Sequence, residues 1–128
     1  MSPDAETTVG ASLAGSPHER CITACFACQQ ACETCAGECL SGPDMMEVMS
    51  ECVRRSVDCA DMCGLCGSFL ARGSDLFVAV CALCAAACER CAEECQKFDQ
   101  ETFRRTTAAC LACAEACRGV AQAPAPLG

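Results

Sequence analysis

Six cysteines near the N-terminus recur at steps of four and three residues, and this spacing is the strongest chemical signal in the chain. They are Cys21, Cys25, Cys28, Cys32, Cys35 and Cys39. An α-helix turns once in about 3.6 residues, so side chains spaced alternately by three and four lie on one face. In a helical bundle that face normally carries large aliphatic side chains and points at the partner helices. Here the face would consist of thiols.

Twelve further cysteines repeat the pattern in three later segments. They are Cys52, Cys59, Cys63, Cys66; Cys81, Cys84, Cys88, Cys91, Cys95; and Cys110, Cys113, Cys117. The same register runs through positions without a thiol, including Met45, Met49 and Ser56 in the second segment and Phe103 and Thr106 in the fourth. We interpret the four faces as the walls of one core built from metal ligands.

The chemistry that this pattern supports best is the binding of a soft, monovalent metal ion. Residues three or four apart on a helix have Cβ atoms about 5–6 Å apart, so two sulfurs can point at one ion between them. Thiolates are soft ligands that select ions such as Cu(I). Each Cu⁺ replaces one thiol proton, so a filled core gains no net charge, and buried net charge is costly. We therefore interpret all eighteen cysteines as ligands of many Cu(I) ions.

Three other uses of cysteine fit the spacing less well. Zinc prefers a tetrahedron of four ligands, which most zinc modules supply from turns. Bacterial ferredoxins carry a trailing Cys-Pro, and no cysteine here precedes a proline. Disulfide frameworks are typical of secreted domains rich in loops. The alternative function is that of a general soft-metal (Zn or Cd) protein or an oxidative-stress thiol protein, which exposed thiols of low pKa would favour.

Start and stop signals divide the chain into four helices. Ser16 and Glu19 have the spacing of a capping box, a proline follows Ser16, and Gly42 with the next proline ends this first helix. Gly73 ends the second helix and Ser74 caps the third. The predicted helices cover about 17–40, 45–71, 75–97 and 100–119.

Connections this short make consecutive helices antiparallel neighbours. The predicted fold is all-α, an antiparallel up-down-up-down four-helix bundle with a Cys-lined core. The bundle covers residues 17–120, a flexible N-terminal arm covers 1–16, and a tail covers 121–128.

Charge and composition exclude several function classes. The net charge is −8 and Lys97 is the only lysine, so there is no basic surface for nucleic acid. Acidic residues between the cysteines, such as Glu89 and Glu94, are expected on solvated helix faces. No apolar run approaches the roughly 20 residues that cross a bilayer. The first residues carry no export signal, which predicts a cytoplasmic protein. With one histidine and no phosphate-binding loop, the chain is not expected to be an enzyme.

Runs such as CITACFAC (residues 21–28) and CALCAAAC (residues 81–88) resemble those of the four-helix-bundle copper storage proteins, specifically the cytosolic type without an export signal. The resemblance implies storage or buffering of copper, many Cu(I) ions per chain, and commonly a homotetramer. It also implies His or Met ligands near a bundle end where copper enters, and the candidates are His18, Met45 and Met49. Antiparallel packing places His18 at one end and the two methionines at the other. The His18 end keeps a cysteine on all four helices, so copper is expected to enter there.

Overall fold

The computed structural model describes residues 15–42 and 46–122, with only the backbone of residues 46–48. Within these residues the chain forms four helices and no strands, namely α2 (Pro17–Ser41), α3 (Met46–Ala71), α4 (Phe77–Cys95) and α5 (Glu101–Gln122). The predicted all-α fold is confirmed. Most of the predicted N-terminal arm, most of the predicted tail, and Met45 lie outside the described residues.

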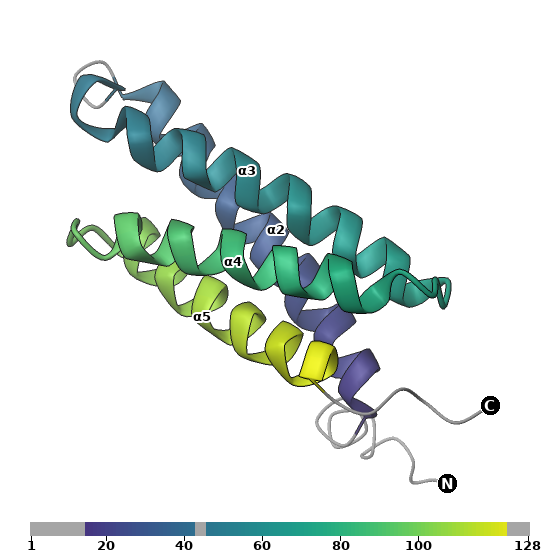
Figure 1. The fold of residues 1–128 in the computed structure, drawn as a ribbon. Coiled ribbons are helices and arrows are strands. Elements are labelled where there is room, and N and C mark those ends of the chain that lie inside the picture. Colours follow the sequence, from purple (N-terminus) through teal and green to yellow (C-terminus); the bar gives the residue numbers. More distant parts are fainter. Residues whose placement is uncertain (1–14, 43–45, 123–128) are drawn as a thin grey trace, which may run out of the picture.

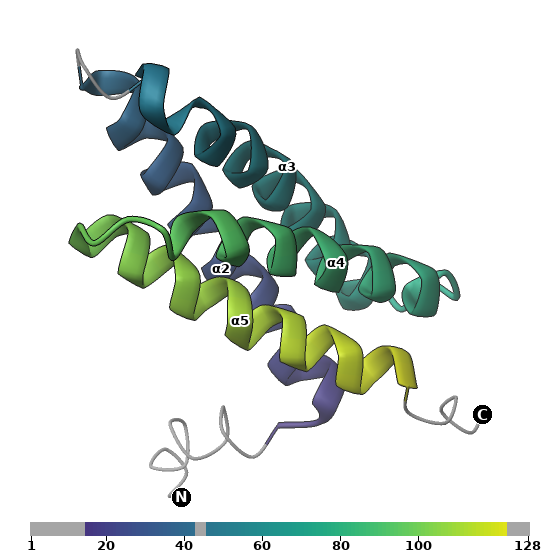
Figure 2. The ribbon, with the colours of Figure 1, turned by 60° about the vertical axis from the view of Figure 1, so that its left-hand side comes forward.

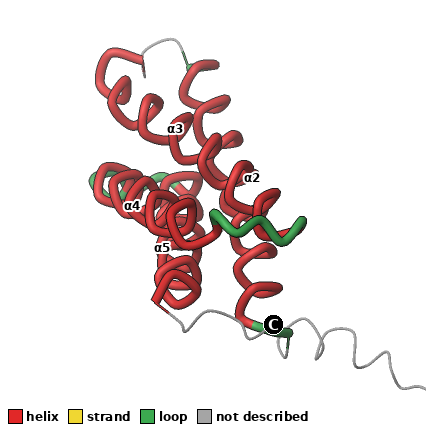
Figure 3. The backbone as a smooth tube through the Cα atoms, turned by 45° about the vertical axis from the view of Figure 1, so that its right-hand side comes forward, coloured by secondary structure: helices red, strands yellow, loops and turns green. Residues whose placement is uncertain are grey.

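Each helix packs against two others and lies diagonally across the core from the third. α2 contacts α3 and α5, and α4 contacts the same two helices. The beginning of α2 and the end of α5 lie at the same end of the bundle (Figures 1 and 2). The colours of Figure 1 show each helix running back along the one before it, and Figure 3 shows α3 beside α2. The predicted up-down-up-down arrangement is therefore confirmed.

The first helix begins at the predicted capping box. Ser16 Oγ accepts a hydrogen bond from the Glu19 backbone N–H at 3.1 Å, and Glu19 Oε1 accepts one from the Ser16 N–H at 3.0 Å. Two otherwise unpaired donors of the first turn are thus satisfied. Pro17 occupies the first helical position, where its missing N–H removes no helical hydrogen bond.

The turn between α3 and α4 differs from the prediction in one respect. Gly73 has φ 70°, a left-handed conformation suited to glycine, and its N–H donates to the Leu70 carbonyl at 3.1 Å. The prediction that Ser74 caps the next helix is wrong, because α4 begins at Phe77 with Leu76 in the capping position. Ser74 Oγ instead accepts from the Leu76 N–H at 3.2 Å, a local turn that imitates a cap.

All eighteen cysteines lie in the core, and each is 0% exposed. Few large side chains accompany them: Phe103 and Val120 are fully buried, and Leu70 and Met49 nearly so. Five buried alanines flank the thiols and let the helix backbones approach closely, namely Ala36, Ala60, Ala85, Ala92 and Ala114. Among the described residues, none of the helices combines the length and the apolar character needed to span a membrane.

Among the side chains that the structure describes, the acidic ones mostly lie on the surface, with one exception. Glu89 accepts two hydrogen bonds from Arg118, at 2.6 and 3.0 Å, and so links α4 to α5. Glu94 was expected on a solvated face but is only 7% exposed, with Lys97 Nζ 3.0 Å from its Oε1. The pairing offsets part of the cost of burying a carboxylate.

The core consists of small buried thiols and alanines in contact with one another, and the apo-protein is therefore expected to be helical. Sulfur–sulfur distances of 3.5–4.0 Å are frequent across the helices, as in the 3.7 Å contact between Cys28 and Cys110. Burial of small thiols and alanines, together with the capping box, favours helices before any ion binds. Far-UV circular dichroism of the reduced, metal-free protein should show a helical spectrum. A random-coil spectrum that becomes helical only with Cu(I) would contradict this expectation.

Candidate metal site

The thiols are stacked in layers along the bundle axis, numbered here from the Pro17 end of α2. Layer one contains Cys21, Cys66, Cys81 and Cys117, one from each helix. Cys21 Sγ lies 3.5 Å from Cys117 Sγ, and Cys66 Sγ lies 3.6 Å from Cys81 Sγ. A third contact of 4.0 Å joins Cys66 to Cys117, so all four sulfurs of the layer are connected.

The next two layers are built in the same way. Layer two contains Cys25, Cys63, Cys84 and Cys113, and layer three contains Cys28, Cys59, Cys88 and Cys110. In layer two, Cys113 Sγ lies 3.7 Å from Cys25 and 3.8 Å from Cys63. In layer three, Cys28 Sγ lies 3.7–4.0 Å from the sulfurs of all three other members. These layers are rings of four thiols, one from each helix.

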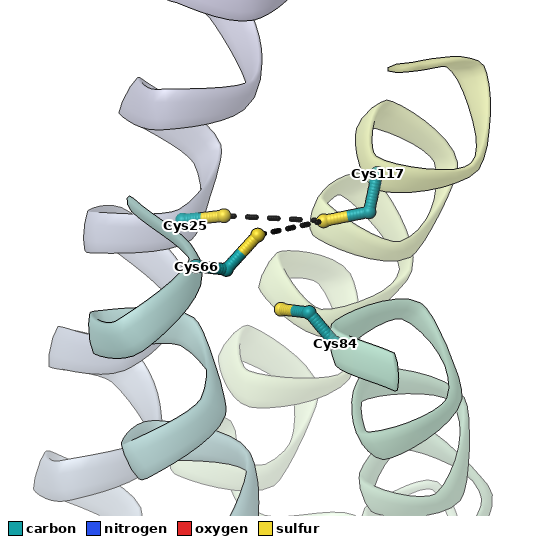
Figure 4. A group of neighbouring side chains, drawn as sticks. All are labelled: Cys25, Cys66, Cys84 and Cys117. Atoms are coloured by element: carbon teal, nitrogen blue, oxygen red, sulfur yellow. Dashed lines mark hydrogen bonds between the residues drawn. The ribbon is translucent and has the colours of Figure 1, made fainter. Parts of the chain in front are cut away.

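Sulfurs of adjacent layers also form compact groups. Figure 4 shows Cys25, Cys66, Cys84 and Cys117, whose sulfurs converge from four helices and lie within 4.8 Å of one another. Other groups with the same spacing are Cys28, Cys59, Cys63, Cys88; Cys28, Cys32, Cys59, Cys110; and Cys63, Cys84, Cys88, Cys113. Because Cys28 and Cys63 each belong to two groups, a thiolate here can bridge two ions. The geometry suits a cluster of many soft ions sharing ligands.

The stack of layers, called the column from here on, changes composition beyond layer three. Layer four contains Cys32, Ser56, Cys91 and Thr106, and layer five contains Cys35, Cys52, Cys95 and Phe103. Ser56 Oγ lies 3.6 Å from Cys91 Sγ, and Cys52 Sγ lies 3.2 Å from Cys95 Sγ. Layer four therefore offers two sulfurs and layer five offers three.

Hydrogen bonds between thiols shift their pKa values in opposite directions. The hydrogen bond with Cys110 is the largest of several that lower the pKa of Cys28, and the contact with Cys28 is the main cause that raises the pKa of Cys110. Near the other end of the bundle, hydrogen bonds lower the pKa of Cys35 to about 3, and the one with Cys52 contributes most. Burial raises the pKa of Cys39 to about 11. A thiolate is stabilised where its neighbours stay protonated. The whole column can lose its protons only if cations replace them.

The two ends of the column carry the candidates other than cysteine. His18 is partly buried with its ring centroid 5.0 Å from that of Phe77, above layer one. Met49 is buried at the opposite end, where its φ of −109° and ψ of 16° interrupt α3. These are the ends that the antiparallel order predicts for the two side chains. Met45 lies outside the described residues.

One feature of the core could not be recognised from helical register alone. Cys39 shares the Met49 end with an aromatic pair, Phe98 and Phe103, whose ring centroids lie 4.9 Å apart. Register places Phe103 on the core face of α5, but Phe98 lies in the connection that follows α4, so the tilted contact between the two rings depends on the conformation of that connection. The signal in the sequence was that Phe98 continues the spacing of the cysteines before it and that Phe103 lies on the cysteine face of the next helix.

Comparison with known proteins gives concordant matches. A family model described as copper storage protein (Csp) matches residues 14–122. The uncharacterized cysteine-rich protein YhjQ of Bacillus subtilis is 39% identical over 67 residues, which is 52% of this chain and 61% of that protein. The match therefore spans less than two thirds of that relative's length.

Two solved structures share the fold. The Cu(I)-bound copper storage protein BsCsp3, copper storage protein 3 of Bacillus subtilis, is 38% identical with a TM-score of 0.78, covering 83% of this chain and 99% of that one. A cytosolic copper storage protein of Streptomyces lividans, in a structure with five coppers, is 35% identical with a TM-score of 0.78, covering 88% of this chain and 95% of that one.

Proposed function

This chain belongs to the copper storage protein family, and from that premise we propose that it stores Cu(I) on its eighteen core thiols at about one ion per thiol. The observation that carries the proposal is the continuous column of buried sulfurs. All of them are fully buried, they come from every helix, and many lie within 4 Å of a sulfur on another helix. Such a column provides shared ligands for a large number of ions rather than one isolated site.

Electrostatics supports Cu(I) over a divalent ion. An ion-to-thiolate ratio near one leaves the interior neutral, because each Cu⁺ compensates one S⁻. Zinc bound by four thiolates would leave net negative charge at every site in a core that excludes water. With a net charge already at −8, the protein gains nothing from further buried negative charge.

The complete burial of the thiols also fits storage better than it fits a role in redox defence. Cysteines that react with oxidants are accessible and have low pKa values. Here every thiol is shielded from solvent, including Cys35, whose pKa is low. Buried thiols react slowly with bulky oxidants, whereas a small ion can enter a packed core by displacing protons. The proposed role is therefore to sequester copper and limit its free concentration, without catalysis.

The decisive experiment is an anaerobic titration of reduced apo-protein with Cu(I) against a competing chromophoric chelator. We expect saturation near eighteen ions per chain, with about one proton released per ion because each thiol must deprotonate to bind. A pH indicator in weakly buffered solution measures the protons. Saturation at about four ions or fewer would rule out storage, and tighter binding of zinc under the same conditions would favour the general soft-metal function.

The relatives and the two ends of the column support proposals on the cellular location of the protein, its oligomeric state and its ligands other than cysteine. The relative from Streptomyces lividans is described as cytosolic, which supports a cytoplasmic location for this chain. We also propose a homotetramer, and the support for it is the resemblance to the family. We also propose His18, Met45 and Met49 as ligands at the two ends of the column, with the His18 end as the entrance. The full ring of four thiols in layer one lies next to His18 and supports this choice.

A further inference from the structure

Layer four is the one level between layers one and five at which oxygen replaces sulfur on two helices. Ser56 on α3 and Thr106 on α5 lie on opposite sides of the core, and both are buried, at 0% and 1% exposure. Their neighbours in the layer, Cys32 and Cys91, come from the diagonal pair α2 and α4. The ring of thiols is thus interrupted on both sides at the same height.

Neither hydroxyl is an effective substitute for a thiolate as a ligand of Cu(I). Thr106 Oγ1 donates to the Thr102 carbonyl at 2.7 Å and lies 3.4 Å from the Ala31 carbonyl, so its hydrogen bonding is with the backbone. Ser56 Oγ lies 3.6 Å from Cys91 Sγ. A neutral hydroxyl oxygen is a hard ligand and a poor partner for Cu(I). Ions at this level have two sulfurs available, compared with four in each of layers one to three.

Beyond layer four the sulfurs form a smaller set. Cys35, Cys52 and Cys95 share layer five with Phe103, and Cys39 lies at the end of α2. Phe103 is fully buried and takes the place of a fourth thiol. Fewer sulfurs per layer mean fewer bridging ligands for each ion, and hence weaker binding.

We propose that the hydroxyl layer divides the copper core into two segments that fill separately. The main segment comprises layers one to three with Cys32 and Cys91 at its border, and the end segment comprises Cys35, Cys39, Cys52 and Cys95. The segments touch along α4, where Cys91 Sγ lies 3.8 Å from Cys95 Sγ, so ions can pass between them while the cluster itself is interrupted. This inference rests on the proposed storage of Cu(I) and specifies how the same site is organised.

The test compares Cu(I) competition titrations of the wild type with those of Ser56→Cys/Thr106→Cys, which completes the ring in layer four. The wild type should show two classes, about fourteen ions and about four, with affinities that differ by about tenfold or more. The double variant should show one class and a capacity larger by about two ions. Val57→Cys/Ala108→Cys is the matched control, because it adds one thiol to each of the same helices at exposed positions. The control should keep both classes of the wild type.

Three results of these titrations would show that the core is not divided into two segments. A single class in the wild type, or two classes that persist in a folded double variant, would overturn the inference. So would a control pair that merges the classes as the core pair does. Crystals of the wild type loaded with about ten ions test the same point without substitutions: anomalous copper signal should be confined to the main segment. Equal occupancy in both segments would contradict it. Saturation at about four ions or fewer would instead refute storage itself.

Discussion

Replacing the four thiols of layer three with serine should remove at least about four ions from the capacity of the core. The layer contains Cys28, Cys59, Cys88 and Cys110, and its sulfurs belong to several of the compact groups. Serine is close to cysteine in size, so packing changes little, but its hydroxyl does not bind Cu(I) well. Neighbouring sulfurs in layers two and four also lose bridging partners, which should weaken binding of the remaining ions. The same anaerobic chelator competition measures both the capacity and the affinity.

A variant with serine at Cys35, Cys39, Cys52 and Cys95 is the matched control, because it removes the same number of thiols from the thinner end. It should lose about four ions and leave the affinity of the others unchanged, whereas the layer-three variant should also lose affinity. Circular dichroism verifies that both variants are helical. Equal effects of the two variants on the residual affinity would mean that position along the column does not matter.

Phe103→Ala should lower the free energy of unfolding of the apo-protein by about 3–5 kcal/mol. Phe103 is the largest fully buried side chain among the described residues, and its ring centroid lies 4.9 Å from that of Phe98. Truncation removes apolar contacts and leaves a cavity in a core that has few other large side chains to fill it. Urea unfolding of the reduced protein, followed by circular dichroism, measures the loss.

Phe26→Ala provides the control for this prediction. Phe26 is 41% exposed on α2, so its truncation should cost about 1 kcal/mol or less. A similar loss for both variants would mean that the end of the core near Phe103 contributes no more than a surface position. Bound Cu(I) should reduce the effect of Phe103→Ala at a given urea concentration, because ions that bind only the folded state stabilise it.

The buried face of each helix could be predicted from the sequence because a thiol at every third or fourth position leaves one choice of face. The antiparallel order followed from the short connections, and it places His18 at the end of the bundle where the structure has it, 5.0 Å from Phe77 between ring centroids. The reduced thiol content at Ser56 and Thr106 was also visible, because both residues continue the register.

Other features depend on interactions that register does not encode. Ser74 has the composition of a helix cap, yet the chain makes a local turn there and α4 starts later, at Phe77. Glu94 follows the charge pattern of a surface residue but is buried beside Lys97, because helix packing decides how much of each flank is covered. The interruption of α3 at Met49 carries no glycine or proline signal.

The side chains other than cysteine at the two ends of the column also determine how neighbouring helices are aligned along the bundle axis. Rings of identical thiols would fit almost as well after one helix slides along its neighbour by one ring, so the cysteines alone leave the alignment of the helices ambiguous. The Phe98–Phe103 pair at one end and the His18–Phe77 pair at the other are bulky and unlike the thiols. Sliding would place a ring against a space sized for sulfur and expose another ring to water. These few side chains therefore select one alignment among near-equivalent alternatives, as distinctive core residues do in other helical bundles.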